Sequence, residues 1–315
     1  MATELDVGRL RLLREVGLRG SIAGAARAVG ITPSAVSQQL AVLEKETSTS
    51  LLERSSRGVV LTGAGQLLAE RATQVLDLLT AASADLDRLS GSVAGEVRVA
   101  AVPSAAATVV SSGVCALRET APRISVSVVA AEPDRAIGLL LTGDVDLAVV
   151  DEYALVPLAL PENAVVDELA IEPLVVVGPA GPMPRTTALA DLADADWVMP
   201  PENAACGRAV RAACRTAGFD PRVRWETDDM LLLVRAVADG HGIAVLPRRS
   251  VADGAAAVSI GALCDPVPTR RLLAVARASS ASRPVVAAVL AALQAAARPR
   301  SSPSPDKLTG VSRKK

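Results

Sequence analysis

Apolar positions between residues 21 and 46 follow helical spacing in two segments that a short turn separates. These positions are Ala25, Ala26 and Val29 in the first segment, and Val36, Leu40 and Leu43 in the second. Gly30 lies at the turn, where a glycine adopts a left-handed conformation at little steric cost. Thr32 is a good N-cap and Pro33 suits the first helical position. The pattern therefore predicts a helix, a tight turn and a second helix.

A β-hairpin is predicted next, between Leu51 and Leu61. Two leucines precede a basic segment of small residues that contains Arg54 and Arg57, and an apolar run follows it. Apolar runs around a small-residue connection are typical of a hairpin. Its basic tip is suited to lie on a phosphate backbone.

A long amphipathic helix is predicted from about Gly63 to Leu89, with Thr62 as its cap. Its apolar stripe consists of Leu68, Val75, Leu79, Ala82, Leu86 and Leu89. An extended helix with one apolar face and no compact domain of its own needs a partner helix, which predicts a dimer. A serine- and glycine-rich segment at 90–95 then ends the helix and forms a hinge.

Strand and helix patterns alternate from residue 96 to the last predicted helix. Strands are expected at 97–102, 124–130, 145–150, 174–178, 197–199, 243–246 and 272–276, with helices at 104–120, 133–142, 206–217, 228–238 and 284–297. Consecutive βαβ units predict a parallel sheet with helices on its faces. Two such sets predict a two-lobed α/β module like the periplasmic binding proteins, with crossovers near Ala164 and Asp265.

Composition narrows the class of protein but says little about chemistry. Half of the 315 residues are hydrophobic and only 1% are aromatic, so aliphatic side chains must build the core. No apolar run is long enough for a membrane span, and the N-terminus lacks a secretory pattern, so a cytoplasmic protein is expected. The four cysteines show no CxxC spacing and His241 is the single histidine, so no metal site is expected.

The N-terminal segments resemble the LysR-type transcriptional regulators. The resemblance is carried by GSIAGAARAVGITPSAVSQQLAVLE and LLERSSRGVVLTGAGQLL at the family's spacing, and extends more weakly over about residues 5–298. The chain has Ser48-Thr49-Ser50-Leu51-Leu52 where the family usually has Gly-x-x-Leu-Phe. It has Thr62-Gly63-Ala64-Gly65 where the family usually has Thr-Pro-x-Gly. Neither departure removes a group that would contact DNA.

The resemblance implies an α/β chain in three parts. A winged helix-turn-helix DNA-binding domain is expected at 1–62, a linker and dimerisation helix at 63–91, and a two-lobed effector-binding domain at 92–298. Lobe I is expected at 95–164 and 265–298, lobe II at 165–264, and a disordered basic tail at 299–315. The resemblance further implies a homodimer or dimer of dimers that binds double-stranded DNA and a small-molecule effector. RNA polymerase is a further candidate partner, and no cofactor is expected.

The residues predicted to contact DNA lie on the second helix, the wing and the segment after it. They are Thr32, Ser34, Ser37, Gln38, Gln39, Arg54, Arg57 and Thr62. Hydroxyl and amide side chains hydrogen-bond base edges in a major groove, and glutamine suits adenine. The arginines would neutralise phosphates.

Three strand ends predict where a ligand binds. They are the start of the helix at 104, the loop before the helix at 206, and the start of the helix at 228. In open α/β sheets ligands bind beyond the carboxyl ends of strands, often at helix N-termini. By analogy with the family, the effector-binding candidates are Ser104, Ala105, Asp151, Asn203 and Thr227. Ser104, Thr227 and Asp228 also suit a purely structural role as helix caps.

Three alternative functions are weighed against an effector-responsive regulator. A redox sensor would use Cys206 and Cys214, and nearby Arg208 and Arg211 would lower a thiol pKa. On one continuous helix, however, their Cα atoms would lie about 12 Å apart, too far for a disulfide without local unfolding. A ligand-independent DNA binder would show no effector response. An enzyme using Cys206 and His241 is not expected, because no phosphate loop, nucleophile elbow or metal motif accompanies them.

Overall fold

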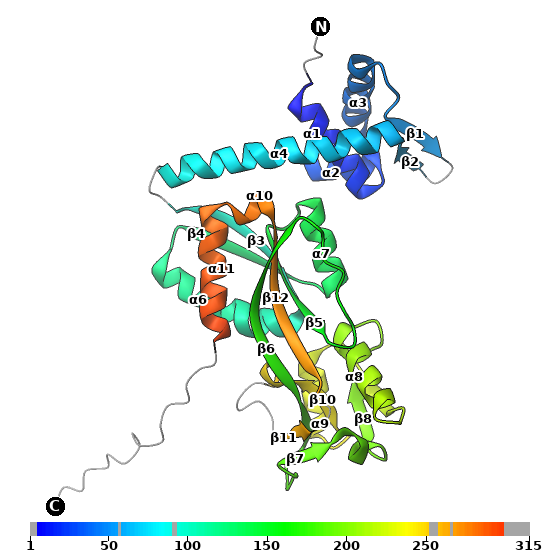
Figure 1. Cartoon of the computed structure of the whole chain (residues 1–315), viewed down its shortest axis with the longest axis vertical. Helices are drawn as coiled ribbons and strands as arrows, with labels where there is room; N and C mark the ends of the chain where they lie inside the picture. Colours follow the sequence, from blue (N-terminus) through cyan, green and yellow to red (C-terminus); the bar gives the residue numbers. More distant parts are fainter. Residues whose placement is uncertain (1–4, 56–57, 90–92, 252–257, 265–266, 299–315) are drawn as a thin grey trace, which may run out of the picture.

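The N-terminal unit is a winged helix-turn-helix. The computed structural model describes residues 5–55, 58–89, 93–251, 258–264 and 267–298. The unit contains α1 (Val7–Arg19), α2 (Ile22–Val29), α3 (Pro33–Thr47) and the hairpin of β1 (Leu52–Ser55) and β2 (Gly58–Leu61). Figure 1 shows it packed around one end of a long helix, with the hairpin at its outer side. The predicted architecture of this unit is confirmed, whereas the predicted basic tail lies outside the described residues.

The turn between α2 and α3 has the local chemistry that the sequence predicts. Gly30 has a φ of 75°, and its N–H donates to the Ala26 carbonyl at 2.9 Å. The Thr32 hydroxyl accepts a hydrogen bond from the Ala35 N–H at 3.2 Å, and Pro33 occupies the first turn of α3. The buried side chains of α3 pack into the core of the unit, so the opposite face of α3 is left exposed.

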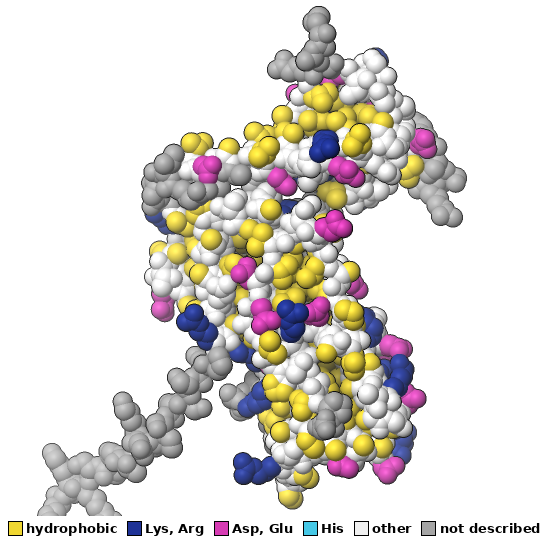
Figure 2. Space-filling view, viewed as in Figure 1, with side chains coloured by type: hydrophobic (Ala, Val, Ile, Leu, Met, Phe, Trp, Pro, Cys, Tyr) yellow, Lys and Arg dark blue, Asp and Glu magenta, His cyan; other side chains and the backbone are white. Residues whose placement is uncertain are grey.

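The linker helix α4 (Gly63–Leu89) has the predicted bounds. The Thr62 hydroxyl accepts from the Gly65 N–H at 3.0 Å and donates to the Ser50 carbonyl at 2.8 Å, so Thr62 caps α4 and ties it to the wing. Two leucines of the predicted stripe, Leu79 and Leu86, are 51% and 68% exposed in the single chain. Figure 2 shows hydrophobic side chains along the outer edge of this helix. The dimer itself stays a prediction.

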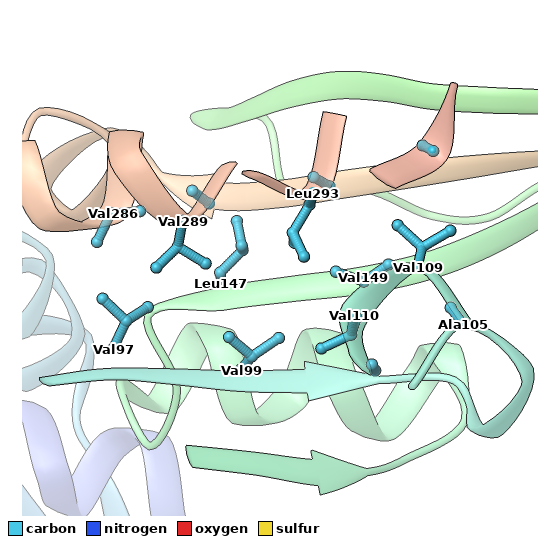
Figure 3. Packing of buried hydrophobic residues seen from close by; sticks show 14 of the residues in the cluster. Val97, Val99, Ala105, Val109, Val110, Leu147, Val149, Val286, Val289 and Leu293 are labelled. Carbon is cyan, nitrogen blue, oxygen red and sulfur yellow. The ribbon is translucent and has the colours of Figure 1, made fainter. Parts of the chain in front are cut away.

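Lobe I is a five-stranded sheet with helices on both faces. Its elements are β3 (Gly95–Ala101), α5 (Pro103–Ala105), a π-helical turn (Ala106–Val110), α6 (Ser111–Thr120), β4 (Ile124–Ala130), α7 (Pro133–Thr142), β5 (Leu147–Tyr153), β12 (Thr269–Arg277), α10 (Ala278–Ala281) and α11 (Pro284–Ala297). The strand order is β4-β3-β5-β12-β6. One face carries the aliphatic cluster of Figure 3, in which Val99 and Leu147 of the sheet pack near Val289 and Leu293 of α11. α7 covers the other face.

Lobe II continues the same sheet through β6 (Ala164–Pro179). Its other elements are β7 (Thr186–Ala188), the 3₁₀ turns Leu189–Leu192 and Arg248–Ser250, β8 (Asp196–Met199), α8 (Ala205–Thr216), β9 (Arg222–Glu226), α9 (Met230–Ala238), β10 (Ala244–Pro247) and β11 (Val258–Cys264). Both β10 and β11 pair with β6, and β8 pairs with β9. In Figure 1 the two lobes are joined by the long strands β6 and β12.

The prediction of a parallel arrangement holds for β3, β4 and β5 and for the pairs β7–β11 and β8–β9, but not for the rest of the main sheet. Strand β12 runs antiparallel to both β5 and β6, and β10 and β11 run antiparallel to β6. Parallel neighbours need a long crossover, usually a helix. Strand β12 instead enters lobe I from lobe II and runs against both of its neighbours, whereas β5 and β6 run in the same direction as each other.

Strand β6 also places the lobe junction differently from the expected crossover at Ala164. Its first part, Ala164–Pro173, pairs with β12, and its second part, from Leu174 onward, pairs with β10 and β11. The partner strands therefore change between Pro173 and Leu174. The second expected crossover, Asp265, lies outside the described residues. Strands β7, β9 and β11 were not predicted; β9 reads RVRWE, which alternates polar and apolar residues over only five positions and is mostly exposed.

Candidate functional site

The exposed face of α3 is polar and uncharged over the first turns of the helix, from Ser34 to Gln39. Ser34, Ser37, Gln38 and Gln39 are all exposed, whereas Val36 and Leu40 between them are buried. The Ser37 hydroxyl donates to the Pro33 carbonyl at 3.0 Å, so its oxygen remains available as an acceptor. This face presents hydrogen-bonding groups of the kinds that base edges recognise.

Glu44 anchors α3 to the wing, a role that the sequence did not reveal. One of its carboxylate oxygens accepts from the Leu51 N–H at 2.8 Å and from the Leu52 N–H at 3.1 Å. This contact satisfies two backbone donors at the start of the hairpin and fixes the hairpin relative to α3. Of the predicted wing residues, Arg57 lies outside the described residues, and the structure describes only the backbone of Arg54, in β1.

A cavity of about 40 Å³ lies between the lobes where several strand ends meet. Two of the predicted effector residues, Ser104 and Asp151, line it together. Ser104 follows β3 and Asp151 lies near the end of β5, and these neighbouring strands are parallel, so their carboxyl ends meet at one edge of the sheet. The ends of these strands thus bring the two side chains to the same place, as the sequence predicted.

Arg270 of β12 is the central charged side chain of this cavity. It is 1% exposed, and its Nε donates to Glu172 Oε1 at 3.0 Å while Nη1 donates to Ser104 Oγ at 2.6 Å. Nη2 also binds Glu172, and Nη1 lies 3.5 Å from Asp151 Oδ2. Burial alone would lower the pKa of Arg270, but the acidic groups around it, Tyr153, Glu172 and Asp151, more than offset this and raise it. The guanidinium therefore stays charged and joins three strands.

Asp151 is buried with one oxygen unsatisfied. Its Oδ2 accepts from the Tyr153 hydroxyl at 2.9 Å, whereas its Oδ1 is buried and has no hydrogen-bond partner among the described residues. Burial raises the pKa of the Asp151 carboxyl above its ordinary range, and the Arg270 charge and the Tyr153 hydrogen bond offset this only in part. A buried acceptor without a donor costs about 1–3 kcal/mol, so this oxygen is a natural point of contact for a ligand.

Glu132, the residue before α7, adds a half-buried carboxylate and connects the lobes. Its Oε2 accepts from the Ala205 N–H at the N-terminus of α8, at 3.5 Å. Burial raises the pKa of Glu132, and the charge of Asp151 raises it further. Because Glu132 follows β4 directly, the same rule about strand ends applied to β4 would have identified it.

The other predicted effector residues do not line the cavity. Ala105 is fully buried in the core of lobe I. Asn203 is exposed, and its backbone carbonyl accepts from Arg208 at 2.9 Å. The Thr227 hydroxyl accepts from the Asp229 N–H at 3.1 Å, and Asp229 rather than Thr227 or Asp228 caps α9. The lobe II residues that do line the cavity include Cys206 and Asp228.

The two candidate redox thiols lie in surroundings that disfavour the thiolate. Cys206 lines the cavity and Cys214 is fully buried, and both are on the continuous helix α8. Burial raises the pKa of each thiol to about 12, so the expected lowering by Arg208 and Arg211 does not occur as a net effect. Arg208 bonds the Asn203 carbonyl, and Arg211 bonds the Pro200 carbonyl and Glu226.

His241 and the metal-ligating side chains are the remaining candidates for chemistry among the described residues. The His241 ring lies against Trp225, with ring centroids 4.9 Å apart, and no hydrogen bond to Cys206 is found among these residues. Within the same part of the chain, no group of three or more His, Cys, Asp or Glu side chains could hold a metal ion. No helix in the described ranges is long and apolar enough to cross a membrane.

A larger groove, of about 1130 Å³, separates α1 and α4 from lobe I. Three of its charged side chains pair with one another, since Arg98 and Arg283 both bind Asp146 at 3.3 and 3.0 Å. It also lies away from the carboxyl ends of the strands. We interpret it as a gap between two structural units, and assign the candidate ligand site to the smaller interlobe cavity.

Comparisons with known proteins agree with both halves of this structure. Residues 90–298 match the family described as LysR substrate binding domain, and residues 7–66 match the bacterial regulatory helix-turn-helix protein, lysR family. The probable HTH-type transcriptional regulator LrrA of Synechococcus elongatus is 29% identical over 279 residues, which cover 88% of this chain and 92% of that protein. A probable hydrogen peroxide-inducible genes activator of Streptomyces viridosporus is 28% identical over 304 residues, covering 93% and 95%. The structure of full-length OxyR from Pseudomonas aeruginosa aligns over 96% of this chain and 99% of that one, with a TM-score of 0.71 and 21% identity, so the two share a fold.

Proposed function

This chain belongs to the LysR family of bacterial DNA-binding transcriptional regulators with an effector-binding domain, and from that premise we propose specific roles for α3 and the interlobe cavity. Ser34, Ser37, Gln38 and Gln39 contact bases and phosphates of a double-stranded operator. The arginines of the wing, Arg54 and Arg57, neutralise phosphates, and Thr32 and Thr62 position α3 and the wing.

The observation that carries this proposal is the exposed uncharged polar face of α3. Residues 33–43 contain no charged side chain, and their buried positions hold the helix against the core of the unit. A charged side chain would attract any phosphate, whereas amides discriminate between base edges. This composition supports sequence-specific contact, with nonspecific affinity supplied by the wing.

The effector would bind in the cavity that Ser104, Asp151 and Arg270 line. Because both lobes supply walls of this cavity, a ligand that prefers one arrangement of the lobes shifts the population toward that arrangement. Strand β12 continues into α10, which contacts α4. The altered lobe arrangement would thereby reach the linker helix and the spacing of two DNA-binding units, with RNA polymerase as a further contact.

The test of DNA recognition is footprinting on the DNA immediately upstream of the coding region, with a salt titration. We expect a discrete, partly palindromic footprint that exceeds nonspecific affinity by roughly a thousandfold or more. Gln38→Ala should reduce the binding free energy by about 1–3 kcal/mol at one base position. Arg57→Ala should weaken binding to all DNA sequences alike and lower the slope of log affinity against log salt concentration by about one unit. Gln74→Ala, at an exposed position of α4, is the control. Uniform binding that disappears with salt would contradict sequence-specific recognition.

The test of the dimer is sedimentation of the full chain with Leu79→Glu and Leu86→Glu together. A charge on an apolar helix interface disfavours association, so the double variant should sediment as a monomer. It should also lose cooperative binding to a two-part site. A double variant that dimerises as the unchanged chain does would exclude α4 as the interface.

A further inference from the structure

The charged groups of the interlobe cavity are mostly acidic. Glu132, Asp151 and Asp228 line it, and Arg270 is the only basic side chain among the described lining residues. Glu132 and Asp151 line the same small cavity, and the charge of Asp151 raises the pKa of Glu132. An anionic ligand would therefore enter a site in which three carboxylates face one guanidinium.

The single guanidinium is already used by the protein. Arg270 donates through Nε and Nη2 to Glu172 and through Nη1 to Ser104, and its Nη1 lies 3.5 Å from Asp151. Two carboxylates thus compensate its charge in a buried position. Three of its five N–H groups are thereby used, and a ligand carboxylate would have to compete with Glu172 and Asp151 for its charge.

The other element that attracts anions, the N-terminus of α8, is also occupied. α8 has twelve residues and directs its free N–H groups toward the cavity region. The Ala205 N–H already donates to Glu132 Oε2. Free N–H groups and the helix dipole favour an anion at such a position, and here a protein carboxylate already lies against the first of these N–H groups.

The unsatisfied group in the cavity is an acceptor. Asp151 is 6% exposed, and its Oδ1 is buried without a hydrogen-bond partner among the described residues. An unsatisfied carboxylate oxygen requires a donor, and a charged donor gives the stronger hydrogen bond. The unsatisfied Oδ1 of Asp151 and the excess of acidic side chains are two separate observations, and both favour a ligand that is cationic and donates hydrogen bonds.

We propose that the effector of this protein carries a cationic hydrogen-bond donor, an ammonium or amidinium group, which binds Asp151 Oδ1 with Glu132 and Asp228 nearby. The inference rests on the proposed function of the cavity as the effector site. A volume of about 40 Å³ suits such a head group, since one water needs about 10–15 Å³ by this kind of measure. The rest of the ligand would extend past the exposed Asp228.

The test compares matched amines and carboxylates on the full-length chain by calorimetric titration and thermal shift. The probes are ammonium, n-butylamine, 1,4-diaminobutane, acetamidine and benzylamine against formate, butyrate, succinate, acetate and benzoate, with magnesium chloride as an inorganic cation. We expect saturable binding of at least one amine or amidine and of none of the carboxylates. Asp151→Asn and Glu132→Gln should each weaken that binding, the former by roughly 10- to 100-fold, the range for one hydrogen bond to a charged group. Glu119→Gln, an exposed carboxylate on α6, is the control and should bind as the unchanged chain does.

The outcomes separate this inference from the proposed function. If a carboxylate binds and Asp151→Asn leaves that binding unchanged or strengthens it, the proposal of a cationic effector is overturned, whereas the proposal that the cavity is the effector site stands. Failure of every amine and amidine to bind would also overturn it, as would binding that neither Asp151→Asn nor Glu132→Gln weakens. The footprint on the upstream DNA is measured separately, so a loss of sequence-specific DNA binding would count against the proposed function and not against the ligand class.

Discussion

Replacing Arg270 by methionine tests whether the buried charge network holds the two lobes together. The substitution keeps an unbranched apolar stem and removes the guanidinium that binds Glu172 and Ser104. Its neighbour Arg271 offers a matched control on the same strand. Arg271 also binds two carboxylates, Glu152 at 2.6 Å and Glu168 at 2.9 Å, but its side chain is 49% exposed, compared with 1% for Arg270.

The expected magnitude follows from burial. Glu172 is 6% exposed and would retain only the Arg249 N–H, at 2.8 Å, on its other oxygen. Breaking a buried pair by removing one partner costs about 3–5 kcal/mol, because a buried charge is left uncompensated. Arg271→Met should cost far less, since water screens exposed ion pairs. Adding Glu172→Met to Arg270→Met should restore a large part of the loss, because the uncompensated carboxylate is then removed.

The measurement is urea unfolding of the full chain, followed by fluorescence. Trp197 and Trp225 are the only two tryptophans and both lie in lobe II, so the signal reports the lobe that Arg270 joins to the rest of the sheet. A cost below about 1 kcal/mol for Arg270→Met would refute the argument from burial. Equal losses for Arg270→Met and Arg271→Met would refute it as well.

Three further predictions concern the cavity and its surroundings. In Gly207→Ala the new Cβ would lie 2.1 Å from a backbone carbonyl oxygen of the loop before α8, so overpacking should cost about 1–3 kcal/mol in the same titration. Gly138 lies in the interior of α7, and no atom lies within 4 Å of the Cβ that Gly138→Ala adds, so this substitution should stabilise the protein by about 0.5–1 kcal/mol. A loss of stability in both variants would contradict this account. Because burial raises the pKa of Asp151, the native state binds the proton of this carboxyl more tightly than the unfolded state does. The stability that the protonated Asp151 contributes is therefore complete below the pKa of the unfolded state and is lost as pH rises through the pKa of the folded state. Asp151→Asn should therefore gain stability relative to the unchanged chain from acid to neutral pH, and a constant difference would exclude this effect. With thiol pKa values of about 12, Cys206 and Cys214 should resist alkylation and oxidation by peroxide near neutral pH until urea unfolds the chain. The exposed Cys115 of α6 is the internal control. A disulfide that forms rapidly between Cys206 and Cys214 would favour a redox sensor.

Local signals in the sequence predicted the DNA-binding unit well. Thr32, Pro33 and the buried positions Val36, Leu40 and Leu43 specify where α3 begins and which face it buries, and all of this information lies within one helix. Glu44 was missed because its role depends on two N–H groups of the next hairpin. A glutamate near the end of an amphipathic helix looks the same whether it is solvated or forms such a contact.

The effector site could be predicted only where a general rule about topology applies. Ser104 and Asp151 follow parallel neighbouring strands, so the rule about carboxyl ends places them together. Arg270 arrives on an antiparallel strand far along the chain, and in the sequence it is indistinguishable from Arg271 beside it. Which of the two arginines is buried depends on the pairing of β12 with β5 and β6, because successive side chains on a strand point to opposite faces.

Strand β12 makes the path from the cavity to the linker helix stiff. From Arg270 at the cavity to Arg277 beside α10 it spans roughly 23 Å, at about 3.3 Å per residue. It is paired with β5 as far as Ala276 and with β6 as far as Arg277, with one shift of register against β6 between Leu272 and Leu273, and Arg277 donates to the Val145 carbonyl at 3.0 Å. A strand held in register on both sides cannot slide by a fraction of a residue, and a slip of one residue would turn its buried side chains to the other face. A rearrangement at the cavity therefore reaches α10 and α4 as a tilt or twist of the whole strand, so the direction of the movement at the linker helix is set by the sheet and its size by the ligand.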